Sequence, residues 1–169
     1  HSNMPFNLTA YIDKNFKSSK SDIFSIFIDR CMQYTSLMGY QSMITQQSWL
    51  SLPGFEKFRT ILLDKKQFIN MVHLGAHGFD EISGEVVSTV SFVFGRKISN
   101  NYYESYLDLT KGRNESEKAN LLLQKKFTFC VKHNNFYKIP KNIIAYDVSN
   151  SVINAFENGT PFYEMAIAK

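Results

Sequence analysis

The chain has 169 residues and a formal net charge of +4, with 44% hydrophobic, 20% charged and 15% aromatic residues. This length suits one domain, with or without an appendage, and the composition is ordinary for a globular protein. No apolar run approaches the ~18 residues of a membrane span and no signal-peptide pattern occurs, which argues against membrane insertion and secretion. The positive net charge permits nucleic-acid binding without establishing it.

Helical periodicity dominates the first part of the chain. Apolar residues within 5–16 recur at helical spacing and predict a short helix. Ser19 or Ser21 is placed to cap a second helix that runs to about Met38, and Gly39 stops it in the C′ position. The apolar stripe of this second helix is wide and one-sided, so we expect the helix to lie on a sheet.

The next segments predict an α/β fold. Residues 40–45 form an apolar strand, and a helix that begins near Pro53 leads into a second strand over 68–73. A confident strand pattern covers 85–94, but the intervening loop is too short for a crossover helix. The sequence therefore predicts two parallel strands followed by one antiparallel strand, with flanking helices.

The last third of the chain predicts a further α+β extension. A strand over 102–109 is expected at an edge of the sheet or appended to it. Asn114 is placed to cap a helix that runs to Lys125, and a short strand follows over 127–131. A final helix is predicted over 149–158.

Neither a disulfide nor a metal site is expected. Cys31 and Cys130 lie about a hundred residues apart in apolar surroundings, so we expect two buried free thiols, as suits a reducing cytoplasm. His73, His77 and Asp80 are close in the sequence, but helical spacing is not expected there and a fourth ligand is not evident. The chain is therefore predicted to hold no metal.

Several stretches, taken in order, resemble one family of enzymes. They are S-D-I-F-S-I-F-I-D-R-C (21–31), M-I-T-Q-Q-S-W-L (43–50), F-E-K-F-R-T-I-L-L (55–63), H-L-G-A-H-G-F-D-E-I-S-G-E-V-V-S-T-V-S-F-V-F (73–94) and F-Y-K-I-P-K-N-I-I-A-Y (136–146). They are similar to the adenine-specific DNA methyltransferases, in particular the PglX-like methylases of BREX phage-defence systems, with the type IIG restriction–modification enzymes as relatives. The resemblance covers most of the chain.

The resemblance implies the fold and the activity of a longer protein. Residues 1–97 would form the C-terminal half of a Rossmann-like class I methyltransferase sheet, 98–135 a strand-helix-strand extension, and 136–169 a connector towards a downstream target-recognition region. The reaction implied is methyl transfer from S-adenosylmethionine to the N6 amino group of adenine in double-stranded DNA. The target base is flipped out of the duplex at a cost of a few kcal/mol.

Two hallmarks of that family are absent from this sequence. The catalytic tetrapeptide Asn/Asp-Pro-Pro-Tyr does not occur, and none of the eight glycines forms the G-x-G of a cofactor loop. We therefore expect the chain to begin after the tetrapeptide, to contain no catalytic residue, to bind no S-adenosylmethionine alone and to be inactive in isolation. The alternatives left open are a non-catalytic module that binds DNA or protein, and an unrelated cytoplasmic α/β enzyme.

The family pattern places some candidate site residues. Phe79, in the loop after the second strand, matches an aromatic residue that closes the far face of the flipped base, although packing in the core is an equal alternative. Gln46 and Gln47 follow the other strand and are the polar candidates for the same pocket, whereas Trp49 is expected mainly to anchor the core. Lysines available for the DNA backbone are Lys65, Lys66 and Lys97.

The first strand predicts an interaction with another chain. In the family the strand over Tyr40 to Thr45 pairs with the strand that leads into the tetrapeptide. Without that neighbour its edge is open, and open apolar edges recruit other strands. We therefore expect a homodimer or strand exchange through this edge. The expected location of the protein is the cytoplasm of a bacterium or archaeon. Solvent exposure of both Met43 and Ile44 in a monomer would contradict the expected sheet order.

Overall fold

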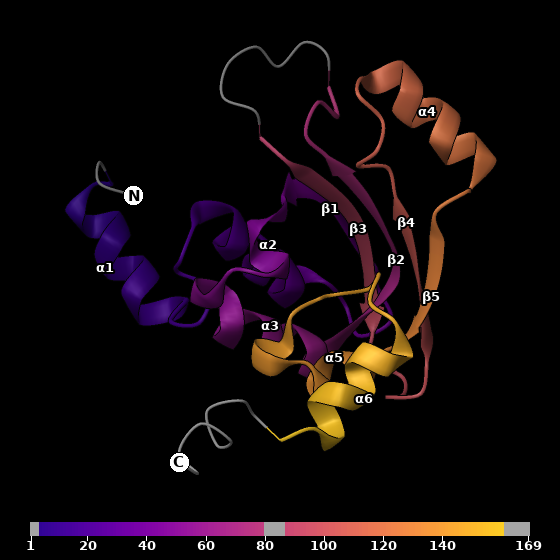
Figure 1. Ribbon diagram of the computed structural model, residues 1–169. Helices are drawn as coiled ribbons and strands as arrows, with labels where there is room; N and C mark the ends of the chain where they lie inside the picture. The colour runs from indigo at the N-terminus through magenta and orange to yellow at the C-terminus, as the bar shows by residue number, and fades with distance from the viewer. Residues whose placement is uncertain (1–3, 80–86, 161–169) are drawn as a thin grey trace, which may run out of the picture.

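The computed structural model describes residues 4–79 and 87–160, which form one five-stranded mixed sheet with helices around it (Figure 1). The strands are β1 (Gln41–Gln46), β2 (Lys66–Gly75), β3 (Thr89–Arg96), β4 (Tyr103–Asp108) and β5 (Thr128–Lys132). The helices are α1 (Phe6–Asn15), α2 (Ile23–Tyr34), α3 (Glu56–Lys65), α4 (Glu115–Gln124), α5 (Asn135–Lys138) and α6 (Asn150–Asn158), with 3-10 turns over Gln47–Leu50, Pro53–Phe55 and Pro140–Asn142. In the described part of the chain, no helix has the length and apolar character needed to cross a bilayer.

The sheet has the strand directions that the sequence predicts. The strand order is β1-β3-β2-β4-β5, and β3 is antiparallel to both β1 and β2. Strands β1 and β2 therefore run in the same direction without bonding to each other, because β3 lies between them. β4 is parallel to β2, and β5 pairs antiparallel with β4 at the edge. The expected pair of parallel strands with one antiparallel strand, and its α+β extension, are confirmed.

The ends of α2 differ from the sequence-based expectation. The cap is Asp22, whose carboxylate accepts a hydrogen bond from the Ile23 N–H at 2.6 Å, and Ser25 completes a capping box. The helix ends at Tyr34 because Thr35 adopts an extended backbone and its hydroxyl donates to the Cys31 carbonyl at 2.7 Å. Gly39 thus follows a short turn beyond the helix and is not its C′ residue.

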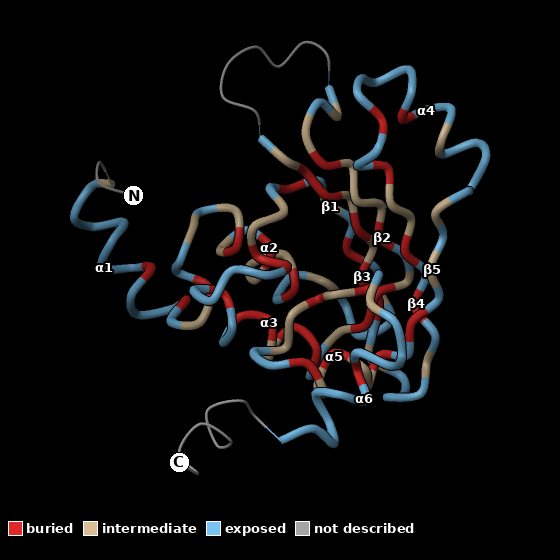
Figure 2. Tube along the Cα trace, in the orientation of Figure 1, coloured by how far each residue is buried: buried red, intermediate tan, exposed pale blue. Residues whose placement is uncertain are grey.

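The core is an aromatic cluster on the sheet face that α2 and α3 cover, where buried segments of both layers meet (Figure 2). Trp49 is fully buried, and its indole N–H donates to the Thr45 hydroxyl at 3.1 Å. Its role as a packing anchor is confirmed. Four buried rings lie within 6.2 Å of the indole, centroid to centroid: Phe58, Phe68, Phe92 and Phe94.

The edge of the sheet at β1 is open in the described residues, since β3 is the one strand that pairs with β1. Gln41 and Thr45 point into the core, and the Gln41 amide donates to the Ile28 carbonyl of α2 at 3.1 Å. Met43, on the same face, is half-buried, whereas Ile44 lies on the opposite face and is 55% exposed. Only one of the two residues is exposed, so the observation that would contradict the expected sheet order is not made.

The segment that follows β5 belongs to the core. Phe136, Ile144 and Tyr146 are buried in the main hydrophobic cluster. The segment is held by Arg59 of α3, whose guanidinium is fully buried and has its pKa lowered by that burial. The guanidinium donates to the carbonyls of Trp49 at 2.8 Å, Leu52 at 2.8 Å and Lys141 at 2.9 and 3.2 Å.

The two cysteines are free thiols, as expected, but their predicted burial is wrong for one of them. Cys31 is partly buried in α2, whereas Cys130 is exposed. Cys130 lies on β5, the edge strand, whose residues alternate between the core face and the outer face. An apolar sequence context does not reveal which of these two faces a residue occupies.

Candidate functional site

Three strands end at one edge of the sheet, which is at the top in Figure 1. β1, β2 and β4 run in the same direction, so their carboxyl ends meet there, and ligands of α/β sheets collect at such edges. A hollow of about 320 Å³ lies at this edge. Its polar lining comes from residues at or just after the ends of the strands and from the segment after β5: Gln47, Ser51, His73, Asp108, Thr110, Tyr146 and Asp147.

A hydrogen-bonded network joins three of these side chains. His73 Nδ1 lies 2.6 Å from the Tyr146 hydroxyl, and His73 Nε2 contacts the Gln47 side-chain oxygen. Burial lowers the pKa of His73, although Asp108 and Asp147 act against that shift, and the ring is therefore neutral at neutral pH. A proton on Nε2 satisfies both contacts, because the ring then donates to Gln47 and accepts from Tyr146.

Tyr146 is held as a hydrogen-bond donor in this network. Burial raises the pKa of Tyr146 far above its usual range, and the nearby carboxylates of Asp108 and Asp147 raise it further. The ring of Tyr146 stacks on that of Tyr106, with centroids 5.1 Å apart, so the hydroxyl is aimed from a rigid position. The hollow therefore presents fixed carboxylate and amide acceptors, which suit a ligand that carries N–H donors.

Lys118 fixes α4 against this edge. Its ammonium group donates to the Leu74 carbonyl at 2.7 Å, just beyond His73, and to the Leu109 carbonyl at 3.1 Å. Burial lowers its pKa, and Asp108 and Glu117 oppose that shift. The buried ammonium group of Lys118 thus donates to carbonyls at the ends of β2 and β4, and these two hydrogen bonds attach α4 to both strands.

The structure separates the predicted base-pocket residues. Gln47 lines the hollow from the 3-10 turn after β1, whereas Gln46, the last residue of β1, is exposed. Phe79 is 38% exposed in the loop after β2 and is not part of the hollow's lining, so it is not a core residue. Its stacking role stays a prediction. Asp80, considered above with the two histidines, lies outside the described residues.

The three predicted DNA-backbone lysines lie together at the other end of the sheet. The Lys97 N–H donates to the Lys65 carbonyl at 3.4 Å, and Lys66 begins β2. A ten-residue strand rises about 30 Å, which separates these lysines from the hollow. The Lys97 ammonium also donates to the Tyr137 hydroxyl at 2.9 Å. Their contact with DNA stays a prediction, and it competes with the surface near α4 that is proposed below.

Sequence reasoning missed Asp108 and Tyr146. Asp108 closes the predicted strand over 102–109, so its place at a strand's carboxyl end was available as a signal. Tyr146 had no such signal, because it meets His73 across 73 residues of chain. His73 itself was considered as a metal ligand, whereas the structure uses both of its ring nitrogens in hydrogen bonds to side chains.

Comparison with known proteins supports the resemblance described above. The family model described as Eco57I restriction-modification methylase matches residues 1–79. The chain is 37% identical over 150 residues to the adenine-specific methyltransferase BrxX of Escherichia coli O9:H4 (strain HS), covering 89% of the chain and 12% of that protein. It is 32% identical over 160 residues to the adenine-specific methyltransferase PglX of Lacticaseibacillus casei (strain Zhang), covering 91% of the chain and 13% of that protein. The chain thus spans about an eighth of the length of these curated relatives.

Solved structures share the fold. The methyltransferase subunit of a type I restriction-modification system from Streptococcus thermophilus superimposes with a TM-score of 0.59 at 14% identity, over 80% of this chain and 33% of that one. A chain from a study of complex assembly and conformational transition in a type I restriction-modification system superimposes with a TM-score of 0.54 at 14% identity. The match covers 85% of this chain and 34% of that one. At this identity the likeness shows the fold alone, and it confirms the methyltransferase-like α/β architecture.

Proposed function

We propose that this chain, whose homologues are adenine-specific methyltransferases of BREX and restriction–modification systems, forms the target-base side of an S-adenosylmethionine-dependent DNA N6-adenine methyltransferase. The observation that carries the proposal is identity of more than 30% over about nine-tenths of the chain to two such enzymes. The cofactor loop and the catalytic tetrapeptide would be supplied by another segment of the enzyme. We place this enzyme in the cytoplasm of a bacterium or archaeon, where its DNA substrate lies.

The hollow at the carboxyl edge supports a role in receiving the flipped base. Adenine's reactive amino group is an N–H donor, and Gln47, Asp108 and Asp147 offer oxygen acceptors at that edge. His73 holds the Gln47 amide in one orientation, so Gln47 is a candidate to contact the base and His73 a positioning residue. The exposed ring of Phe79, beyond the end of β2, would stack on the base.

Replacing Phe79 with alanine tests this assignment. We expect Phe79→Ala in the full-length polypeptide that carries this chain to lower kcat/KM for methyl transfer to DNA about 10- to 100-fold, because stacking of a base on an aromatic ring contributes about 1–3 kcal/mol. Phe79→Trp keeps a stacking surface and should retain most activity. Transfer of a radiolabelled methyl group to a duplex measures both.

Phe156→Ala is the matched control, since Phe156 is an exposed phenylalanine on α6. It should leave kcat/KM within about twofold of the parent. Equal loss of activity in Phe79→Ala and Phe156→Ala would contradict the role of Phe79. Failure of the full-length polypeptide to methylate adenine at all would contradict the proposed function.

We also propose that the chain forms a homodimer, or exchanges strands, through β1. The proposal is supported by the open edge of that strand and by exposed apolar side chains along it, Tyr40 and Ile44. We expect Ile44→Lys to convert the dimer to a monomer, because a lysine on an edge strand opposes pairing with another strand. Sedimentation velocity over a range of concentrations measures the outcome, and a parent chain that stays monomeric throughout would rule out dimerisation.

A further inference from the structure

Two lysines from opposite ends of α4 each lie within cation–π distance of one aromatic ring. Lys111 precedes the helix and Lys126 follows it, yet their ammonium groups lie 4.3 and 5.7 Å from the centroid of the Phe127 ring. The two charges are therefore no more than about 10 Å apart. Both lysines and Lys125 are exposed, and Phe127 is half-buried. Like charges held this close repel each other, and a bound anion relieves that repulsion.

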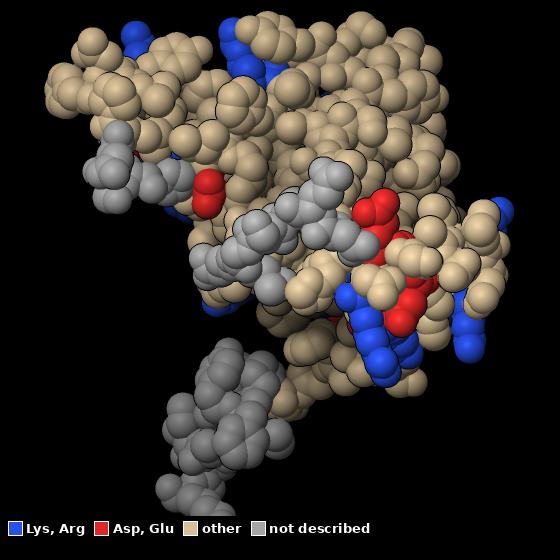
Figure 3. Space-filling model, turned by 90° about the horizontal axis from the view of Figure 1, so that it is seen from above, with Lys and Arg blue, Asp and Glu red and all other residues tan. Residues whose placement is uncertain are grey.

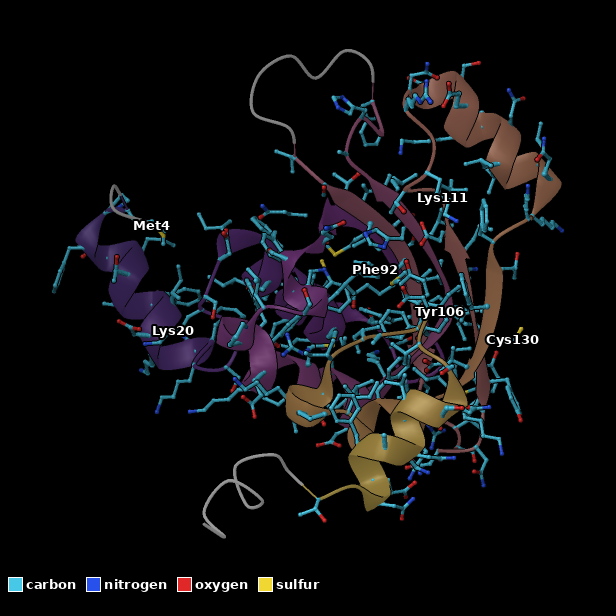
Figure 4. The ribbon with its side chains drawn as sticks, in the orientation of Figure 1. Met4, Lys20, Phe92, Tyr106, Lys111 and Cys130 are labelled. Atoms are coloured by element: carbon cyan, nitrogen blue, oxygen red, sulfur yellow. The ribbon has the colours of Figure 1, made fainter. Side chains whose placement is uncertain are left out.

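Lys111 and Phe127 adjoin residues that line the hollow, and Lys111 directly follows one of them, Thr110. The Phe127 carbonyl accepts a hydrogen bond from the Asp108 N–H at 2.9 Å, and Asp108 lines the hollow. The buried ammonium of Lys118 holds α4 in place above the ends of β2 and β4. Figure 4 shows Lys111 at this end of β4, below α4, and Figure 3 shows charged side chains gathered on the α4 side of the edge.

The carboxylates of α4 lie at its start. Glu115 and Glu117 occupy the first turn, where the helix dipole favours negative charge, and Glu117 accepts from the Arg113 N–H at 2.9 Å. Lys125 and Lys126 lie at the opposite end, where the dipole favours positive charge. The helix thus presents its basic end together with Lys111 and the ring of Phe127.

We propose that Lys111, Lys125 and Lys126, with Phe127 beneath two of them, contact the phosphate backbone of double-stranded DNA at the rim of the hollow. The inference rests on the proposed function, in which this edge of the sheet receives a base from a duplex. Closely spaced ammonium groups match the closely spaced charges of a nucleic-acid strand. Lysine contacts of this kind position the duplex and carry no sequence information.

The salt dependence of DNA binding tests the inference. The variant Lys111→Gln/Lys125→Gln/Lys126→Gln is compared with Lys65→Gln/Lys66→Gln/Lys97→Gln, which removes the sequence-predicted lysines at the far end of the sheet. Each variant lowers the formal net charge from +4 to +1, so the two differ in position and not in total charge. Fluorescence anisotropy of a labelled duplex of about 20 base pairs, titrated with the full-length polypeptide that carries this chain between 50 and 200 mM salt, measures affinity and its salt slope.

We expect the first variant to bind at least tenfold more weakly at low salt, with a slope of log K against log salt reduced by about 2 to 3, since each lost phosphate contact removes about 0.9. The second variant should keep the parent slope. Equal losses in both variants, a larger loss in the second, or no DNA binding by the unmodified full-length polypeptide would overturn the inference. Circular dichroism confirms that each variant is folded. The methyl-transfer assay on Phe79 variants remains a separate test, so the proposed function can survive failure of this surface.

Discussion

We expect His133→Ala to lower the free energy of unfolding by about 3–5 kcal/mol, measured by urea denaturation, because it leaves a buried carboxylate without its partner. His133 and Glu104 are both fully buried, and His133 Nδ1 lies 2.7 Å from a Glu104 oxygen. His133 Nε2 lies 2.9 Å from the Leu63 carbonyl. The ring therefore ties the Glu104 side chain to the backbone of α3.

Glu104 is the centre of a network that joins the extension to the rest of the sheet. Its carboxylate also accepts from the Phe68 N–H of β2 at 2.9 Å and from the Tyr106 hydroxyl at 2.5 Å. Burial, and after it the Glu104 carboxylate, raises the pKa of Tyr106 well above its usual range, so that hydroxyl stays a donor. Strands β2, β4 and β5 and the end of α3 thus converge on one buried charge.

A double-mutant cycle isolates the charge pair. Glu104→Gln removes the charge but keeps an acceptor, so His133→Ala should cost at least about 1.5 kcal/mol less in that background than in the parent chain. An equal cost in both backgrounds, or a cost below about 1 kcal/mol in the parent chain, would show that the pair is not what holds β4 and β5 in place.

The second large loss of folding stability is expected on replacement of Arg59. Replacing it with methionine should destabilise the chain by about 3 kcal/mol or more, because three backbone carbonyls lose their donor and each buried, unsatisfied group costs about 1–3 kcal/mol. Arg59→Lys should lose most of the same stability, since one ammonium group has a different shape from the planar fork that spans these carbonyls. Urea denaturation of both variants measures the loss.

Arg96→Met is the matched control for Arg59→Met. Arg96 is exposed at the end of β3, and its replacement should change the free energy of unfolding by less than about 0.5 kcal/mol. A small effect at Arg59, similar to that at Arg96, would mean that the segment around Lys141 is not held by the guanidinium.

Local patterns in the sequence predicted most of the secondary structure. Pro53 and the apolar spacing after it indicated a helix, and α3 lies there. The short loop between β2 and β3 excluded a crossover helix, and the two strands pair antiparallel. These inferences succeeded because helix and strand periods, and the minimum length of a crossover, are properties of short stretches of chain.

Features that depend on distant contacts could not be predicted in this way. Nothing in the local pattern shows that β3 lies between β1 and β2, because the pairing order depends on which strand buries most surface against its neighbours. The contact of His73 with Tyr146 joins residues far apart in the chain. Gln46 and Gln47 are adjacent and both polar, yet only Gln47 lines the hollow, because β1 ends at Gln46 and the chain turns into a 3-10 helix at Gln47.

The central claim is that DNA meets the edge at which β1, β2 and β4 end. Hydrogen–deuterium exchange of the chain, with and without a DNA duplex, tests it most directly because it compares both ends of the sheet in one experiment. We predict slower exchange on DNA binding in residues 73–79 and 108–127, with no change in 64–66 and 96–99. Protection confined to 64–66 and 96–99 would contradict the account, because it would place the duplex at the opposite end of the sheet.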